Sequence, residues 1–219
     1  MKPLIKLCGL MRLEDVLAAN RAAPDMVGFV FAKESRRAVS ASKAAEMRAA
    51  LAAGIQPVGV FTDAPLSEIL ALVRAGTIEL VQLHGSDSHE QAESCVAALH
   101  AHGVKVIRAI RVSRAADLRA AERSSADLLL LDSARPGHGE PFDHALLRNF
   151  PRAYLLAGGL TPESVGLAVR ALRPFGVDVS SGIETHGSKD ADKMLAFTRN
   201  ATEAASVERA SMISNSLTN

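Results

Sequence analysis

The stretch YLLAGGLTPESVGLAVRALRPFGVDVS, residues 154–180, holds one complete structural repeat of the chain. It begins and ends in short apolar runs, 154–157 and 176–180, of the length and composition typical of buried strands. Between them, residues 162–172 carry apolar side chains at helical spacing, and glycines separate the segments. The stretch therefore predicts a strand, a helix and a second strand.

The same alternation of short apolar runs and longer Ala- and Leu-rich segments repeats along the whole chain, with no linker between repeats. The strands expected from the apolar runs are LIKLC (4–8), MVGFVF (26–31), QPVGVFT (56–62), LVQL (80–83), KVIRAI (105–110), DLLLLD (127–132), YLLA (154–157) and GVDVS (176–180). Helices are expected at 13–21, 42–53, 66–75, 89–102, 115–123 and 162–172 and from Lys189 onward, with a short turn from Asp143.

The spacing from strand to strand, roughly 22 to 30 residues, is that of a βα repeat, because neighbouring parallel strands need a crossover helix. Eight repeats within about 200 residues predict an α/β protein with a single-domain (β/α)8 barrel over residues 1–200. An open doubly wound sheet is the alternative, because the number of elements does not prove closure. Residues 201–219 form a polar, Ser- and Asn-rich tail that we expect to fray.

The composition indicates a globular cytoplasmic protein. The 219 residues are 48% hydrophobic and 22% charged, enough to build a sizeable core. The net charge is +1 without a basic tract, so nucleic acid is not an expected partner. Lys6 interrupts the first apolar run, and no window approaches ~18 uninterrupted apolar residues, so neither a signal peptide nor a membrane span is expected. Cys8 and Cys95 lack metal-type or disulfide-framework spacing, and we expect both to be reduced.

In a barrel of this kind, chemistry is done at the carboxyl ends of the strands and in the loops that follow. Two glycine-containing loops follow the last two strands, AGGLTPES after the seventh and VSSGIETHGSKD after the eighth. Their glycines let backbone N–H groups approach an anion closely, and their serines add hydroxyl donors. Two tight turns are the alternative, but such loops on consecutive strands favour a phosphate site. The phosphate-binding residues expected are Gly158, Gly159, Ser180, Ser181 and Gly182.

Two reactive side chains end the first and sixth strands. Cys8 closes LIKLC and stands before Gly9, although a cysteine beside a strand is more often a small buried hydrophobe, as we expect for Cys95. Asp132 follows four leucines, where an acid needs a partner or a function to offset its desolvation. A helix cap or an ion pair with Arg135 is the ordinary alternative. The functional interpretation is a catalytic pair in which the carboxyl group of Asp132 donates a proton.

Other polar residues at expected strand ends are Arg36, Arg37, Asp63, His84 and Asp178. A planar guanidinium suits a substrate carboxylate, because it is always charged and can bind both oxygens. Two adjacent arginines, however, are more often a solvated surface, and a lone histidine is more often structural. The sequence lacks the signatures of zinc peptidases, dinucleotide-binding sites, P-loops and G-x-S-x-G hydrolases, and no metal is expected.

Seven motifs, in order from about Lys2 to Arg199, resemble those of phosphoribosylanthranilate isomerases, a family of the tryptophan pathway. They are IKLCGL, VGFVFAKESRRAVS, VGVFTDAP, VQLHG, LLLDS with PGHGEPFDHALL, LLAGGLTPESV and DVSSGIETHGSKD. Their order and their position at strand ends make the resemblance specific. It implies a barrel enzyme that, without a cofactor, converts N-(5′-phosphoribosyl)anthranilate to 1-(2-carboxyphenylamino)-1-deoxyribulose 5-phosphate by an acid–base Amadori rearrangement.

The resemblance also implies roles for single residues. Cys8 matches the general base of the family and Asp132 the general acid. Arg37, the second arginine of SRR, matches the residue that binds the anthranilate carboxylate; His84 falls in a motif that lines the substrate site, and the glycine loops hold the phosphate. We group Asp178 with the substrate-binding residues. Cys8 must lose its proton to act as a base, which requires positive potential nearby, for instance from Arg37 or from the substrate iminium.

The sequence departs from the family pattern at His138 and His144, which replace a hydroxyl residue and a tryptophan after the sixth strand. Another sugar-phosphate isomerase, such as the ribonucleotide isomerase of the histidine pathway, is one alternative, but it predicts acidic residues where Cys8 and the region of Ile110 stand. A phosphate-binding barrel without activity is another, and the intact catalytic pair argues against it. We expect a monomer, because no long exposed apolar segment stands out.

Overall fold

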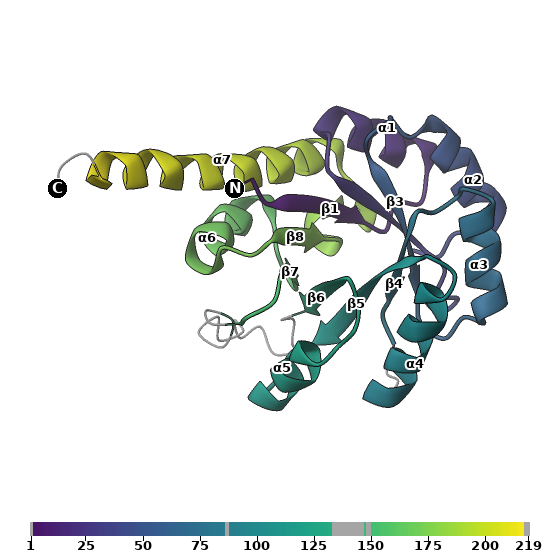
Figure 1. Cartoon of the computed structure of the whole chain (residues 1–219). Coiled ribbons are helices and arrows are strands. Elements are labelled where there is room, and N and C mark those ends of the chain that lie inside the picture. The colour runs from purple at the N-terminus through teal and green to yellow at the C-terminus, as the bar shows by residue number, and fades with distance from the viewer. Residues whose placement is uncertain (1, 86–87, 133–146, 148–149, 217–219) are drawn as a thin grey trace.

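The computed structural model describes residues 2–85, 88–132, 147 and 150–216, of which residues 207–216 are described as backbone alone. Eight parallel strands form a closed barrel in which each strand pairs with the next along the chain, and the first pairs with the last. Helices surround this barrel (Figure 1). The predicted (β/α)8 barrel is therefore confirmed, and the alternative of an open sheet is wrong.

The barrel strands are β1 (Leu4–Cys8), β2 (Met26–Val30), β3 (Gln56–Phe61), β4 (Leu80–Leu83), β5 (Lys105–Arg111), β6 (Leu128–Asp132), β7 (Tyr154–Ala157) and β8 (Gly176–Val179). The helices are α1 (Leu13–Ala22), α2 (Ala41–Ala50), α3 (Leu66–Arg74), α4 (His89–His100), α5 (Ala115–Glu122), α6 (Pro162–Leu172) and α7 (Ala191–Ser216). After β8 come a 3-10 turn, η2 (Ser181–Ile183), and a hairpin of β9 (Glu184–Thr185) and β10 (Ser188–Lys189). The turn expected from Asp143 lies outside the described residues, as do Arg135, His138 and His144.

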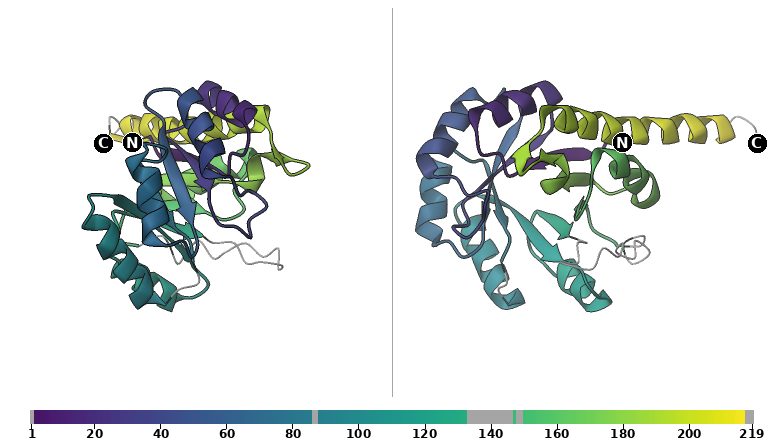
Figure 2. Two further views of the ribbon diagram at one scale, coloured as in Figure 1. Left: turned by 90° about the vertical axis from the view of Figure 1, so that its right-hand side faces the viewer. Right: turned by 180° about the vertical axis from the view of Figure 1, so that it is seen from behind.

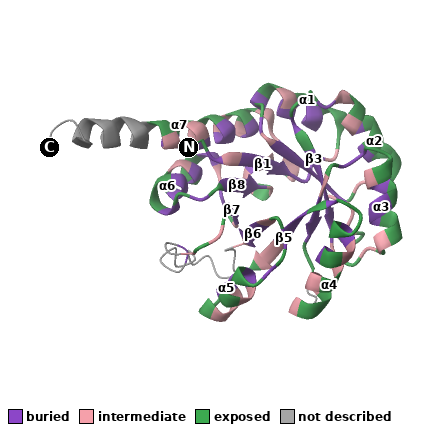
Figure 3. Ribbon diagram, viewed as in Figure 1, coloured by how far each residue is buried: buried purple, intermediate pink, exposed green. Residues whose placement is uncertain are grey.

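The alternation of side chains along each strand divides the interior into two regions. Residues that face outward, such as Ile5 and Leu7 of β1, pack with the helices in the main hydrophobic core. Residues that face inward fill the barrel itself, and their apolar members include Met26, Val58, Ile107, Leu130, Leu155 and Ala157. Figure 3 shows the buried residues concentrated on the strands and on the helix faces turned toward them. The inward-facing positions nearer the strand ends are therefore the ones free to carry polar groups.

Side-chain caps explain where several helices begin. The hydroxyl oxygens of Ser40, Ser88 and Thr161 each accept a hydrogen bond from a backbone N–H in the first turn of α2, α4 and α6. Pro162 follows directly as the first residue of α6, where its missing N–H costs nothing. These local signals fix the helix starts close to the strand ends.

The final helix, α7, lies across α1 and α6 and continues beyond the barrel wall (Figure 2). Its helical backbone passes residue 200, the expected domain boundary, without a break. Phe197, Ala201 and Ala204 are buried, so core contacts extend at least one turn past that residue. Fraying of the remaining tail stays a prediction. No helix among the described residues is both long and apolar enough to cross a bilayer.

Candidate active site

A cavity of about 360 Å³ opens at the carboxyl ends of the barrel strands. Its wall includes the last residues of β1, β2, β6 and β7 and the loops that follow β2, β4, β7 and β8. The residues predicted from the sequence that line it are Cys8, Arg37, His84, Asp132, Gly158, Gly159, Asp178, Ser180 and Ser181. The fold thus brings to one cavity side chains that the sequence places on distant strands.

Cys8 is buried at the end of β1, beside the backbone of β2. A methyl group on Gly28 would lie 2.7 Å from Cys8 Sγ and 3.3 Å from Lys6 Nζ, so the thiol and the ammonium group share the space that this glycine leaves open. Burial raises the pKa of the Cys8 thiol, and the positive charge of Lys6 offsets only part of this rise. Lys189 adds a smaller contribution in the same direction as Lys6. The positive potential at Cys8 in the free protein therefore comes from buried lysines, and it is too weak to offset burial fully.

Lys6 and Asp178 form a buried ion pair across the seam that closes the barrel. The two residues are register partners on β1 and β8, and Lys6 Nζ lies 2.7 Å from Asp178 Oδ1. Burial alone would lower the pKa of Lys6, but the negative charge of Asp178 and the contact with Cys8 raise it above its ordinary value. Lys6 therefore stays charged although its side chain is completely buried.

Asp132 and His84 lie at the ends of β6 and β4, and both line the cavity. Burial lowers the pKa of His84, while the negative charges of Asp132 and Asp178 oppose that shift. The imidazole is consequently neutral at neutral pH, so it can accept as well as donate a hydrogen bond. No three His, Cys, Asp or Glu side chains in the described part of the chain are grouped as ligands for a metal ion.

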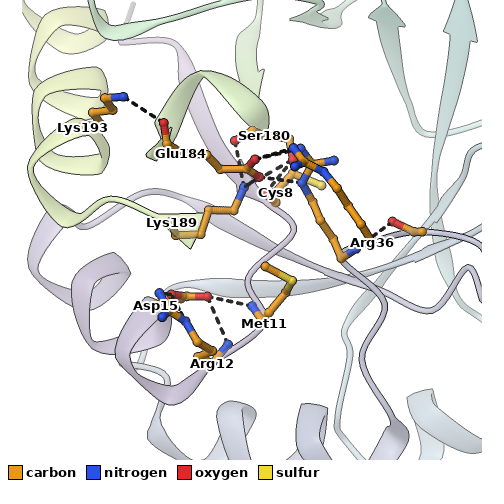
Figure 4. A network of polar contacts seen from close by, with 11 residues as sticks. Cys8, Met11, Arg12, Asp15, Arg36, Ser180, Glu184, Lys189 and Lys193 are labelled. Carbon is orange, nitrogen blue, oxygen red and sulfur yellow. Dashed lines mark hydrogen bonds and ion pairs between the residues drawn. The ribbon is translucent and has the colours of Figure 1, made fainter. Parts of the chain in front are cut away.

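Arg37 is held by a carboxylate of the protein itself, Glu184 at the start of β9. Arg37 Nε donates to Glu184 Oε1 at 2.6 Å, and Nη2 donates to Oε2 at 3.1 Å. Arg36 and Lys189 donate to the same carboxylate at 2.6 and 2.9 Å, as the network in Figure 4 shows. Burial acts to raise the pKa of Glu184, but hydrogen bonds from Arg37 and Lys189 lower it to about 2. This network fixes the Arg37 guanidinium at the cavity rim.

The two glycine loops occupy adjacent parts of the cavity wall. Gly158 and Gly159 have φ angles of +100° and +65°, a backbone conformation that favours glycine. Gly182 is not among the described residues that line the cavity. A methyl group there would lie 1.9 Å from the carbonyl oxygen of Leu160, so this glycine lets the loop after β8 pack against the loop after β7. Gly182 thus contributes to the packing of the two loops against each other and not to the cavity surface.

Ser180 ties the loop after β8 to the first strand. Its Oγ donates to the carbonyl oxygen of Cys8 at 3.1 Å, and its own carbonyl accepts from Lys189 Nζ at 2.8 Å. Gly9 makes this approach possible, because a methyl group there would lie 2.5 Å from Arg37 Cδ and 3.1 Å from Ser180 Oγ. The catalytic cysteine candidate, the loop after β8 and Arg37 are therefore packed as one unit.

Several polar residues of this region were not predicted from the sequence, among them Lys6, Gln82, Glu184 and Lys189. Lys6 and Gln82 stand two positions before Cys8 and His84, on the same inward face of their strands, and the alternation in LIKLC and LVQLH is the signal that points to them. Glu184 and Lys189 lie within the VSSGIETHGSKD motif, but nothing in its spacing shows that they meet Arg37. The strand-end rule therefore identified most of the predicted cavity residues, but not the inward-facing residues two positions deeper in β1 and β4, nor the partners of Arg37.

The chain is similar to a known protein family over most of its length. Residues 5–200 match the family model described as N-(5'phosphoribosyl)anthranilate (PRA) isomerase. The chain is 42% identical over 200 residues to N-(5'-phosphoribosyl)anthranilate isomerase of Lacticaseibacillus casei strain BL23, covering 91% of this chain and 95% of that protein. It is 43% identical over 192 residues to the enzyme of the same name from Lactiplantibacillus plantarum, covering 87% and 88%.

Solved structures agree with the sequence matches. The phosphoribosyl anthranilate isomerase of Thermotoga maritima has a TM-score of 0.81 at 35% identity and covers 91% of this chain and 98% of its own. A structure of phosphoribosyl anthranilate isomerase in complex with reduced 1-(o-carboxyphenylamino)-1-deoxyribulose 5-phosphate has a TM-score of 0.78 at 35% identity with the same coverage. Since the family model and these relatives span almost the whole barrel, the chain belongs to the N-(5'-phosphoribosyl)anthranilate isomerase family.

Proposed function

We propose that this protein isomerises N-(5′-phosphoribosyl)anthranilate to 1-(2-carboxyphenylamino)-1-deoxyribulose 5-phosphate, a step of tryptophan biosynthesis. The observation that carries the proposal is that Cys8 at the end of β1 and Asp132 at the end of β6, three strands apart around the closed barrel, line one cavity together with the loop of Gly158 and Gly159. A base, an acid and an anion cradle are the three parts that this sugar-phosphate rearrangement needs.

The cavity offers a separate binding group for each of the two anionic ends of the substrate. The loops after β7 and β8, with Gly158, Gly159 and Ser181, bind the phosphate through backbone N–H groups and a hydroxyl. Arg37 binds the anthranilate carboxylate. Among the described residues, Glu184 accepts hydrogen bonds from Arg37 Nε and Nη2, so Nη1 is the group assigned to the substrate. The reacting carbons then lie between these anchors.

Asp132 acts first, as the general acid. It protonates the ribose ring oxygen, the bond from that oxygen to C1′ breaks, and the nitrogen lone pair forms the iminium of a Schiff base. His84 lines the cavity with this carboxyl group, and burial lowers the pKa of its imidazole, so the neutral ring adds no positive charge beside the acid. The iminium places a positive charge close to the cysteine.

Cys8 acts next, as the general base. Its thiolate removes the proton from C2′, and the electron pair moves toward the iminium nitrogen to give an enolamine. The enolamine becomes the aminoketone when C1′ gains a proton and the C2′ hydroxyl loses one. Lys6 stabilises the thiolate, and together with the substrate iminium it overcomes the effect of burial on the pKa of Cys8.

The purified protein is expected to consume N-(5′-phosphoribosyl)anthranilate without added metal or nucleotide, which the loss of substrate fluorescence follows. The variants Cys8→Ala and Asp132→Asn should each lower kcat/KM by at least about 100-fold, the usual contribution of a positioned acid or base. Cys95→Ala is the matched control, because Cys95 lies on α4 outside the cavity lining, and it should keep the wild-type rate. Full activity in both cavity variants would remove the roles assigned to Cys8 and Asp132.

The assembly and the location of the protein are part of the same proposal. We propose that it acts as a single chain in the cytoplasm, as its sequence suggests. The solved relative from Thermotoga maritima is described as dimeric, so the single-chain state is a point on which the two proteins would differ.

A further inference from the structure

Gln82 of β4 is a polar side chain whose oxygen has no donor among the described residues. It lies on the inner face of the barrel, with Val60 of β3 and Ile107 of β5 as its register partners. The residue is 2% exposed and lines the cavity, and Gln82 Oε1 is buried without a hydrogen bond from the described protein. A buried amide oxygen without a donor destabilises the fold, so its presence here needs a reason.

The described part of the fold offers no reason for burying this oxygen. Several of the neighbouring inward-facing residues are apolar, and a methionine or leucine at this position would pack among them without burying a polar atom. The other polar residues at this depth, Lys6 and Asp178, satisfy one another by their 2.7 Å contact. Gln82 therefore lines the cavity with an amide whose acceptor oxygen the described protein leaves unused.

We infer that Gln82 is a substrate-binding residue whose Oε1 accepts a hydrogen bond from the central part of the substrate. This inference rests on the proposed function. The carboxylate and phosphate of that substrate are acceptors and cannot donate to an amide oxygen. Its donors are the amine N–H and the sugar hydroxyls, which lie between the two anions. Gln82 therefore recognises the middle of the molecule, whereas Arg37 and the glycine loops hold its ends.

A ligand-binding role and a structural role predict opposite effects when the oxygen is removed. If Oε1 accepts a hydrogen bond from the ligand, its burial lowers the stability of the free protein and raises the affinity for the ligand. A variant without Oε1 then binds less tightly and unfolds no more easily. If Oε1 instead stabilises the folded protein, the same variant unfolds more easily and binds the ligand with unchanged affinity. Stability and affinity measured on one variant therefore distinguish the two roles.

The variant is Gln82→Met, which keeps the size of the side chain and removes the amide. We expect its thermal unfolding temperature to equal or exceed that of the wild type, and its dissociation constant for the reduced product analogue to rise about tenfold. Tyr154→Phe is the matched control, because Tyr154 also buries an oxygen without a described donor but lies outside the cavity lining. It should likewise unfold no more easily, and it should bind the analogue with unchanged affinity.

Two further measurements complete the test. An ether analogue with oxygen in place of the amine N–H identifies the donor. If wild type and Gln82→Met bind this ether with the same dissociation constant, the donor is the N–H. If the variant still binds it less tightly, the donor is a hydroxyl. Gln82→Leu repeats the comparison with a shorter apolar side chain. Unchanged affinity in both variants, or a lower unfolding temperature in both, would overturn the inference while wild-type turnover stands. A wild type that neither binds the analogue nor turns over substrate would instead remove the proposed function.

Discussion

Burial and nearby positive charge shift the pKa of the Cys8 thiol in opposite directions. Burial raises the pKa of this thiol, Lys6 lowers it, and the negative charge of Asp178 raises it again. The free protein consequently holds a protonated cysteine at neutral pH, and the positive iminium of the ring-opened substrate supplies the missing potential. A base that forms only when the substrate is present is protected from oxidation, because the thiolate is the reactive form.

The titration of Cys8 checks this balance. The thiolate absorbance of wild type minus that of Cys8→Ala should appear only above neutral pH, in the alkaline range. Asp178→Asn should move this titration to lower pH, because it removes a negative charge and keeps an acceptor for Lys6. Cys95→Ala is the control and should leave the Cys8 signal in place. A Cys8 signal near neutral pH in the free wild type would contradict the proposed balance.

At the level of elements, one carboxylate connects the hairpin of β9 and β10 to the loop after β2. Glu184 accepts hydrogen bonds from Arg36 and Arg37 on that loop and from Lys189 on β10. Its own carbonyl oxygen accepts from Lys193 at the start of α7, at 2.8 Å. A single side chain thereby positions the proposed carboxylate-binding arginine.

Glu184→Gln should weaken both stability and substrate binding. The pKa of Glu184 is about 2 in the folded protein, below its unfolded value near 4.5, so the charged form stabilises the fold by roughly 3 kcal/mol. That contribution is complete above pH about 4.5 and is lost as the pH falls toward 2. Urea unfolding should therefore show the difference between wild type and variant at pH 7 and a shrinking difference below pH 4. KM should rise, because Arg37 loses its bidentate partner.

Glu79→Gln is the control for that variant. Glu79 forms an exposed ion pair with Arg48, at 2.9 Å, and exposed pairs contribute less than about 1 kcal/mol. Its removal should leave KM unchanged and the unfolding free energy nearly so. A pH-independent difference between wild type and Glu184→Gln would show that the carboxylate charge does not hold the hairpin.

Local patterns in the sequence predicted the elements, because strand length, alternation and helical spacing are properties of neighbouring residues. They also indicated the rim of the site, since the carboxyl ends of parallel strands meet at one end of a barrel. Local patterns could not predict which side chains from the two ends of the chain form ion pairs in the closed barrel. Lys6 meets Asp178, 172 positions away, and Arg37 meets Glu184, 147 positions away, only because β1 closes on β8. The catalytic and binding roles themselves stay predictions.

At the scale of the whole molecule, α7 covers the seam between the first and last repeats. It packs on α1 and α6, and its buried residues Met194, Phe197, Ala201 and Ala204 lie along one face of the helix. Asn200 Nδ2 donates to the carbonyl oxygen of Pro162 at 2.7 Å, which joins α7 to the first turn of α6. The buried ion pair of Lys6 and Asp178 joins β1 to β8 at this same seam. Helix α7 therefore packs on the part of the barrel wall that carries this pair.

Two truncations locate the end of the domain. A chain that ends at residue 200 loses the buried methyl groups of Ala201 and Ala204 and should unfold about 2 kcal/mol more easily, at roughly 0.8 kcal/mol for each buried methyl and a little more for the lost helical turn. A chain that ends at residue 206 keeps these contacts, and the expected fraying of the tail predicts wild-type stability for it. Unfolding in urea, with activity as the second readout, compares both with the full chain. Equal stability of the two truncated chains would place the boundary at residue 200, whereas a loss in the longer one would show that the barrel needs residues 207–219 as well.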